Sequence, residues 1–142
     1  MKLAIGLVLA LVVGFVAITW LALEAGGVAI VETRAADGSV RSTHVWFVEP
    51  EGELWLEAGS ARNPWFEDLS RDSRITLRAD DRAGAYLAKP FEDPDARARI
   101  RALLREKYGL RDRWVGLFVD QSQSLVVRLA PAEALMAHDR GR

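Results

Sequence analysis

The sequence contains no cysteine and only two histidines, His44 and His138, among its 142 residues. The lack of cysteine excludes disulfide bonds, thiol catalysis and thiolate metal ligands, and two histidines are too few for a histidine-rich metal site. Charge of one sign is also lacking, because 19 Lys and Arg residues oppose 20 Asp and Glu residues. This balance removes the electrostatic case for nucleic acid. We therefore expect neither a metal site nor a nucleic-acid partner.

A chain of this length accommodates one domain rather than two. Half of its residues are hydrophobic, and many of them stand at the N-terminus, where residues 3–23 include no charged side chain. At about 1.5 Å per residue, a helix over this run would be roughly 31 Å long, which matches the hydrocarbon core of a bilayer. Lys2 precedes the run, and Trp20 lies near its other end, where an indole suits the membrane interface. The sequence predicts a transmembrane anchor over residues 1–25, with the lipid bilayer as partner of residues 3–23.

A cleaved signal peptide is the alternative for this segment, because Ala25 and Gly27 are small residues at the right offsets for cleavage after Gly27. Signal peptides have apolar regions of about 7–15 residues, which are shorter, so we favour a retained anchor. A buried core helix is disfavoured because the run has no polar face. Basic residues on the two flanks nearly balance, with Lys2 on one side and Arg34 and Arg41 on the other. We expect a single-pass protein of the cell membrane, and the side of its soluble domain stays open.

Beyond Gly26-Gly27, short apolar segments alternate with turn residues, which is typical of β-strands. The predicted strands are residues 28–34, 40–48, 54–58, 74–79, 84–89 and 124–129. In the second strand, Val45 and Phe47 share one face, while His44 and Trp46 share the other. The turn signals between the first three strands favour an antiparallel meander.

Two helices are predicted among these strands. Asn63-Pro64 opens a short one, and Asp93-Pro94 opens a longer one over residues 95–108, which Gly109 ends. Apolar side chains follow one side of the longer helix. Its arginines form a solvated face on the other side: Arg97, Arg99, Arg101 and Arg105.

The expected fold is mainly β (α+β): a closed or partly closed barrel of about six antiparallel strands with two short helices, preceded by one transmembrane helix. A barrel also removes the exposed strand edges that promote aggregation. The predicted domains are the anchor (1–25), the barrel (26–131) and a C-terminal tail (132–142).

Two segments carry a family resemblance: residues 41–48, RSTHVWFV, and residues 59–69, GSARNPWFEDL, which continue to residue 77. They resemble the flavin- and deazaflavin-binding split β-barrels, the superfamily of pyridoxamine phosphate oxidases, and in particular the deazaflavin-dependent nitroreductase and quinone reductase family. The resemblance covers residues 28–131. It implies a split barrel with a deazaflavin coenzyme, or alternatively FMN, in a homodimer or a monomer. Members of the family usually have proline where this chain has His44, which implies an edge position or an altered cofactor contact.

Polar residues in both segments are candidates for holding the cofactor's phosphate. Arg41 and its neighbours offer a cation and hydroxyls on the second strand, and the loop before the short helix offers glycine amides and a hydroxyl. Asn63 is expected near the N-terminus of that helix, where the amides and the dipole favour an anion. The predicted cofactor-binding residues are Arg41, Ser42, Thr43, His44, Gly59, Ser60, Arg62, Asn63 and Trp65.

Each of these residues also has an ordinary structural interpretation, as a surface arginine, a helix cap or a core aromatic. His44 is best interpreted as a strand histidine that faces solvent or a crevice, in preference to a general acid or a haem ligand. We identify no catalytic residue from the sequence.

The sequence and the resemblance together predict a membrane-anchored oxidoreductase that transfers a hydride from a reduced deazaflavin, or FMN, to a quinone or nitro acceptor. In such proteins the cofactor supplies the hydride chemistry, and the protein supplies binding and orientation. The anchor favours a membrane quinone, because quinones reside in the bilayer. The alternatives are a non-catalytic flavin-, haem- or lipid-binding membrane-tethered module and a structural β-domain. The first alternative stays open because no cluster of acid, base and nucleophile is visible.

Overall fold

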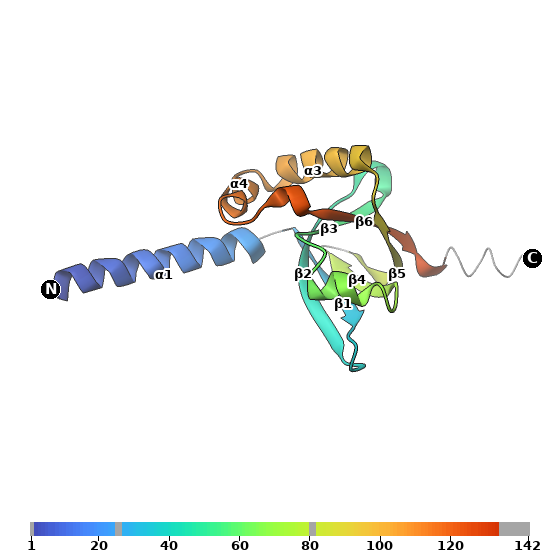
Figure 1. Cartoon of the computed structure of the whole chain (residues 1–142), viewed down its shortest axis with the longest axis horizontal. Coiled ribbons are helices and arrows are strands. Elements are labelled where there is room, and N and C mark those ends of the chain that lie inside the picture. Colours follow the sequence, from blue (N-terminus) through green and yellow to red (C-terminus); the bar gives the residue numbers. More distant parts are fainter. Residues whose placement is uncertain (1, 25–26, 80–81, 134–142) are drawn as a thin grey trace, which may run out of the picture.

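The computed structural model describes residues 2–24, 27–79 and 82–133, and its body is a closed barrel of antiparallel strands (Figure 1). The strands are β1 (Val28–Arg34), β2 (Val40–Val48), β3 (Leu54–Ala58), β4 (Arg74–Ala79), β5 (Arg82–Phe91) and β6 (Leu125–Pro131). Around the barrel they follow the order β1-β2-β3-β6-β5-β4, and every neighbouring pair is antiparallel. The predicted six-stranded antiparallel barrel is therefore confirmed.

The helices are α1 (Lys2–Glu24), α2 (Pro64–Asp68), α3 (Pro94–Tyr108) and α4 (Leu110–Gly116). Short 3₁₀ turns occupy Pro50–Gly52 and Gln121–Gln123. Figure 1 shows α1 extending away from the barrel, with α3 and α4 on one side of it. The sequence missed α4. Gly109 ends α3 as predicted, at a φ of 51°, but the chain turns there and resumes a helix because Trp114 packs its ring against Phe15 of α1.

In the described ranges, no helix combines the length and the apolar character needed to cross a bilayer. The predicted anchor over residues 3–23 stays a prediction. The predicted tail, residues 132–142, lies outside the described residues apart from its first two, and His138 lies outside them as well.

The barrel interior is the main core, and every strand contributes to it by alternation. On β1, Ala29 and Val31 are fully buried, while their neighbours in the strand are more exposed. On β2, Val45 and Phe47 point into this core as predicted. Trp65, the first apolar residue of α2, packs into the same cluster with 1% of its surface exposed. Burying a large apolar side chain in this way contributes roughly 1.5–3 kcal/mol, so these residues dominate the stability of the barrel.

A second apolar cluster lies between the barrel and α3. It consists of Val48, Trp55, Ile100, Leu104, Tyr108 and Val126. Trp46 stacks on Tyr108 with ring centroids 4.4 Å apart, so this part of the second face of β2 is also covered. The Tyr108 hydroxyl donates to the Gly27 carbonyl oxygen at 2.6 Å and accepts from the Phe47 amide at 3.0 Å. One side chain thus ties α3 to β2 and to the start of β1.

Candidate functional site

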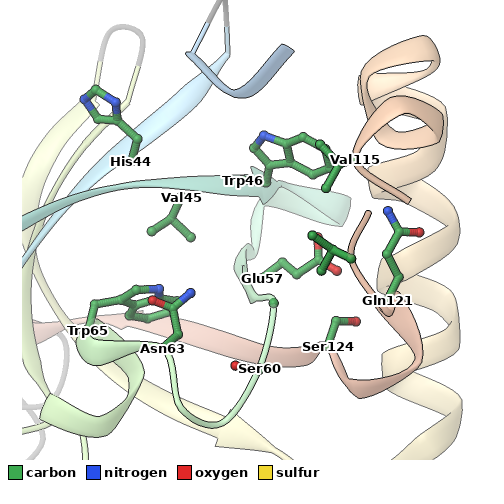
Figure 2. A pocket seen from close by; sticks show the side chains of 12 residues that line it. His44, Val45, Trp46, Glu57, Ser60, Asn63, Trp65, Val115, Gln121 and Ser124 are labelled. Carbon is green, nitrogen blue, oxygen red and sulfur yellow. The ribbon is translucent and has the colours of Figure 1, made fainter. Parts of the chain in front are cut away.

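A pocket of about 540 Å³ lies where the barrel meets the segment containing α4 and the turn that follows it (Figure 2). This volume is in the range of sites that hold small ligands and cofactors. The lining residues come from β2, β3, the loop before α2, α2 itself, α4 and the segment before β6. They are His44, Val45, Trp46, Glu57, Gly59, Ser60, Asn63, Trp65, Val115, Val119, Gln121 and Ser124.

The two segments that carry the family resemblance meet at this pocket. His44 lines it from the first segment. Gly59, Ser60, Asn63 and Trp65 line it from the second. The remaining predicted residues, Arg41, Ser42, Thr43 and Arg62, are not among its lining residues. The structure therefore brings together one end of the predicted strand and most of the predicted loop.

Arg41 is instead engaged in a buried ionic cluster around Asp68, the last residue of α2. The Asp68 side chain is 1% exposed, and its Oδ2 accepts from Arg41 Nε at 2.8 Å and from Thr33 Oγ1 at 2.8 Å. Arg71 donates to the other oxygen. Burial raises the pKa of Asp68, but the hydrogen bonds from Arg41 and Thr33 outweigh this and hold the pKa below its usual value. The positive charge of Arg41 is therefore paired with Asp68 and stabilises the fold.

The lining residues include no lysine and no arginine. The donors that remain for an anion include the neutral Ser60 hydroxyl and Asn63 amide. Asn63 precedes a helix of only five residues and makes no side-chain cap hydrogen bond. A helix this short has few aligned peptide dipoles, so the dipole contribution expected from the sequence is small here.

The other lining residues make the pocket largely apolar and aromatic. Trp46 is held in place by its stacking on Tyr108, and Trp65 is fixed in the barrel core with its ring edge-on to Phe66. Trp65 thus has the core role that its residue type suggested. His44 is exposed, and Figure 2 shows it apart from the other labelled side chains, so the interpretation of a histidine beside a crevice fits its position.

Glu57 brings a charged group to this apolar pocket that sequence reasoning missed. Its carboxylate is 8% exposed, and both of its oxygens accept from Arg101 Nη1, at 2.8 and 3.0 Å. Arg101 was predicted on a solvated helix face, and that prediction is wrong, because its side chain is only 10% exposed. The signals were present in the sequence: Glu57 interrupts an apolar strand, and Arg101 is three and seven residues before the buried Leu104 and Tyr108.

The same guanidinium also holds a second buried carboxylate. Arg101 Nη2 donates to Asp112 Oδ1 at 2.8 Å and to Gln121 Oε1 at 2.8 Å. Gln121 Nε2 in turn donates to the Asp112 carbonyl oxygen at 3.1 Å. Burial raises the pKa of Glu57 above its usual value, and the charge of Arg101 offsets this only in part. Two carboxylates therefore share one buried cation at the pocket wall.

Ser124 completes this wall. It is 1% exposed, and its hydroxyl lies beside the Glu57 carboxylate, where its hydrogen bond lowers the pKa of Glu57 against the larger effect of burial. Figure 2 shows Glu57, Gln121 and Ser124 on one side of the pocket, with Asn63 and Trp65 across from them.

Comparison with known proteins gives a likeness of fold. No family model matches the chain, and no curated protein matches it. Among solved structures, a putative pyridoxamine 5′-phosphate oxidase from Listeria innocua is 16% identical with a TM-score of 0.57, over 80% of this chain and 90% of that one. An F420 reductase is 13% identical with a TM-score of 0.54, over 78% and 90% of the two chains. The haem storage protein HutZ from Vibrio cholerae is 14% identical with a TM-score of 0.58, over 78% and 84%.

These neighbours confirm the resemblance to the split β-barrels of the pyridoxamine phosphate oxidase type. The narrower assignment to the deazaflavin nitroreductase branch stays a prediction. One fold accommodates different cofactors, so the pocket itself must indicate which group fits. Its aromatic and apolar lining suits a flat ring system, and its neutral donors suit the polar edges of such a ring better than a highly charged tail. This chain therefore shares the split-barrel fold, and the lining of its pocket is largely apolar and aromatic.

Proposed function

We propose that this protein is an oxidoreductase that binds a deazaflavin or FMN in the pocket between the barrel and α4 and reduces a quinone or nitro acceptor. The observation that supports this most directly is the convergence of residues 44–46 and 59–65 on one pocket of cofactor size. A reduced flavin or deazaflavin supplies the hydride when it is bound. The residues of this chain would orient the ring: Trp46 and Trp65 supply rigid aromatic walls, and Ser60 and Asn63 supply neutral hydrogen-bond donors.

We further propose that residues 3–23 associate with the membrane and that the acceptor is a lipid-soluble quinone. Large apolar side chains are exposed along α1, including Leu9 at 64% and Leu11 at 64%. Exposed apolar surface on this scale is costly in water and is typical of a contact with lipid or protein.

The packing between α1 and α4 supports a route from the membrane to the pocket. Phe15 of α1 contacts the ring of Trp114, with centroids 5.5 Å apart, and Trp114 Nε1 donates to Thr19 Oγ1 at 3.1 Å. The segment that contacts α1 in this way also supplies Val115 and Val119 to the pocket lining. An acceptor dissolved in lipid beside α1 would therefore lie close to the pocket wall, and tethering would raise its rate of encounter.

The test is spectroscopic. The full-length chain, purified in mild detergent, is titrated with F420, FMN and haem, and binding is followed by visible absorption and fluorescence. We expect a dissociation constant in the micromolar range or lower for F420 or FMN, followed by turnover with a menaquinone analogue. Binding of neither F420 nor FMN at micromolar concentrations would exclude the proposal. Tight binding of haem, or a bound flavin without turnover on quinone or nitro acceptors, would support the non-catalytic module instead.

Membrane association is tested separately by carbonate extraction of membranes from cells that express the full chain. We expect the protein to stay in the membrane pellet. The variant Leu11→Asp places a charge in the middle of the apolar run, and Asp95→Asn, at the exposed start of α3, is its control. A native chain that is fully released by carbonate would contradict the anchor and leave the cofactor proposal to be judged by its own titration.

A further inference from the structure

The α4 segment, residues 110–119, has an inverted arrangement of polar and apolar side chains. Leu110, Trp114 and Leu117 are spaced by four and three residues, so they lie on one face of the helix. The amides of Leu117 and Phe118 donate to carbonyl oxygens three residues earlier, which continues the helical winding past the end of α4. Leu110 is 79% exposed, Leu117 71% and Phe118 61%. A helix on a water-covered surface normally buries such a face.

The acidic residue of this helix faces the opposite way. Asp112 is 4% exposed, and its Oδ1 accepts from Arg101 Nη2 at 2.8 Å. Gln121 Nε2 donates to the Asp112 carbonyl oxygen at 3.1 Å. These contacts fix the rotation of α4 about its axis, so that its carboxylate points into the protein and its leucine points outward. The outward orientation of the apolar face is therefore held in place by a buried ion pair.

The α4 segment lies against the part of α1 that is nearest to the barrel (Figure 1). Phe15 contacts the rings of Trp114 and Phe118, with centroids 5.5 and 5.4 Å away. Trp114 Nε1 donates to Thr19 Oγ1 at 3.1 Å. Phe15 and Thr19 precede residue 23, the end of the apolar run, by eight and four positions.

This spacing sets the depth of the α4 segment relative to the apolar run. At about 1.5 Å per residue along α1, the contacts lie roughly 6–12 Å inside the end of that run. Helices that lie in a membrane interface bury their apolar face by about 5–10 Å, which is a similar depth. Trp20 lies at the same level of α1, and indoles are enriched at this boundary. If α1 is in the bilayer, the exposed face of the α4 segment is therefore at the depth of the outer acyl chains.

The space between the two helices has the same character. A groove of about 580 Å³ lies between α1 and Trp114, and its lining residues are all apolar, aromatic or glycine. Such a lining suits hydrocarbon chains and is costly to leave in water. Arg113 is exposed on α4, and its long side chain can reach lipid headgroups from the margin of the apolar face.

We propose that the α4 segment inserts into the membrane and that its apolar face contacts lipid acyl chains just below the headgroups, beside the end of α1. This rests on the membrane association of residues 3–23 proposed above. Lipid is the occupant of this face because the face is continuous with the apolar run of α1 and lies at the depth of an interfacial helix. Since Val115 and Val119 of the same segment line the pocket, insertion holds the pocket wall at the bilayer surface.

The test measures the depth of a single labelled position. The chain has no cysteine, so Leu117→Cys gives one site for a nitrobenzoxadiazole fluorophore. The full-length chain is reconstituted into vesicles of phosphatidylcholine and phosphatidylglycerol, and quenching by lipid nitroxide is compared with quenching by aqueous iodide. We expect nitroxide on the outer acyl carbons to remove roughly half of the emission or more, and iodide to remove little, because the face lies below the headgroups.

Two further positions serve as controls. Val40→Cys is the matched one, because Val40 is also apolar and 64% exposed but lies at the start of β2. Its label should be quenched by iodide and not by lipid nitroxide. Leu9→Cys, in the apolar run of α1, reports on the membrane association of that run alone. Its label should be quenched by lipid nitroxide.

The outcomes separate this proposal from the one on which it rests. Lipid quenching at Leu9→Cys without lipid quenching at Leu117→Cys overturns the insertion of the α4 segment while the membrane association of α1 stands. A label at Leu117→Cys that neither quencher reaches is covered by protein, such as a second copy of the chain, and this overturns lipid as the occupant. Absence of lipid quenching at both positions overturns the membrane association, and the inserted segment with it.

Discussion

The carboxylates of Asp68 and Glu57 are buried in two different regions of this molecule, and their surroundings differ. Asp68 lies at the end of α2 and receives donors from β1, β2 and the turn that follows α2, so that two cations and a hydroxyl serve one negative charge. Glu57 lies on β3 and shares a single cation with Asp112. The pKa of Asp68 is lowered, and the pKa of Glu57 is raised.

The difference teaches how to separate a structural charge from a functional one. The Asp68 cluster is complete within the chain, and it joins elements that are far apart in the sequence. The Glu57 cluster has two carboxylates for one close cation, and Glu57 lines a pocket. An ionisable group in a cleft whose pKa is shifted by burial and by a specific charged partner is a candidate for a functional residue. The predictions below test whether the two regions differ in this way.

The largest effect is expected from Arg101→Met. This change leaves Glu57 and Asp112 buried without their shared cation, and breaking a buried ion pair in this way costs about 3–5 kcal/mol. The free energy of unfolding, measured by urea denaturation, should fall by an amount in this range. Arg105→Met on the same helix is the control and should change stability by less than about 0.5 kcal/mol, because Arg105 is exposed. Equal losses in the two variants would contradict the assigned cluster.

A smaller loss is expected from Asp68→Asn. The substitution keeps the shape of the side chain but removes the charge that Arg41 and Arg71 contact, and hydrogen bonds to charged groups contribute about 1.5–3 kcal/mol. Both arginines are partly exposed and can turn to water, so we expect a loss of roughly 2 kcal/mol in urea denaturation. Asp72→Asn, which disturbs an exposed pair with Arg74, should cost less than about 0.5 kcal/mol. A loss of that small size in Asp68→Asn would show that the cluster does not hold the barrel together.

Glu57→Gln should cost less than either. After this substitution Arg101 still pairs with Asp112 and Gln121, and the excess negative charge is gone. We expect a change of less than about 1 kcal/mol at neutral pH, measured against Glu53→Gln, whose carboxylate pairs with Arg128 at the surface. A loss as large as that of Asp68→Asn would mean that Glu57 is as fully compensated as Asp68 and would remove the contrast.

The smallest effect is a difference in pH dependence. The folded chain raises the pKa of Glu57 above 4.5, so it binds this proton more tightly than the unfolded chain does. Glu57 therefore disfavours the fold increasingly as the pH rises from about 4.5 through the folded pKa. The stability of Glu57→Gln relative to the native chain should improve over that interval. Asp68 acts in the opposite direction: its pKa is lowered from 3.8, so its contribution is present above pH 3.8 and is lost as the pH falls through the folded pKa.

Urea denaturation of the native chain, Glu57→Gln and Asp68→Asn at a series of pH values measures both trends. The free energy of unfolding of the native chain should exceed that of Asp68→Asn by a smaller amount at acid pH than at neutral pH. If the relative stability of Glu57→Gln is flat or falls as the pH rises, the assigned direction for Glu57 is wrong.

The sequence by itself determined the barrel and much of the pocket's location. Period-2 alternation, as in Val45 and Phe47, fixes which strand face is buried, and the turn residues between strands fix their number, because both depend on local backbone geometry. Loop residues 59–63 were predicted as part of a site from their residue types and from the family resemblance, and Gly59, Ser60 and Asn63 line the pocket. The pairing of Arg41 with Asp68 was not, because those residues are 27 positions apart and only the folded barrel brings them together.

Tertiary structure alone decided the rest. It placed α4 against α1 through Phe15 and Trp114, and it turned Arg101 from the expected solvated face toward Glu57 and Asp112. Such contacts join groups distant in the sequence, and their energies depend on desolvation and on the geometry of partners that no local pattern specifies. The sequence thus determined where strands and turns form. The folded chain determined that Arg41 and Asp68 pair within the barrel and that Glu57 lines the pocket.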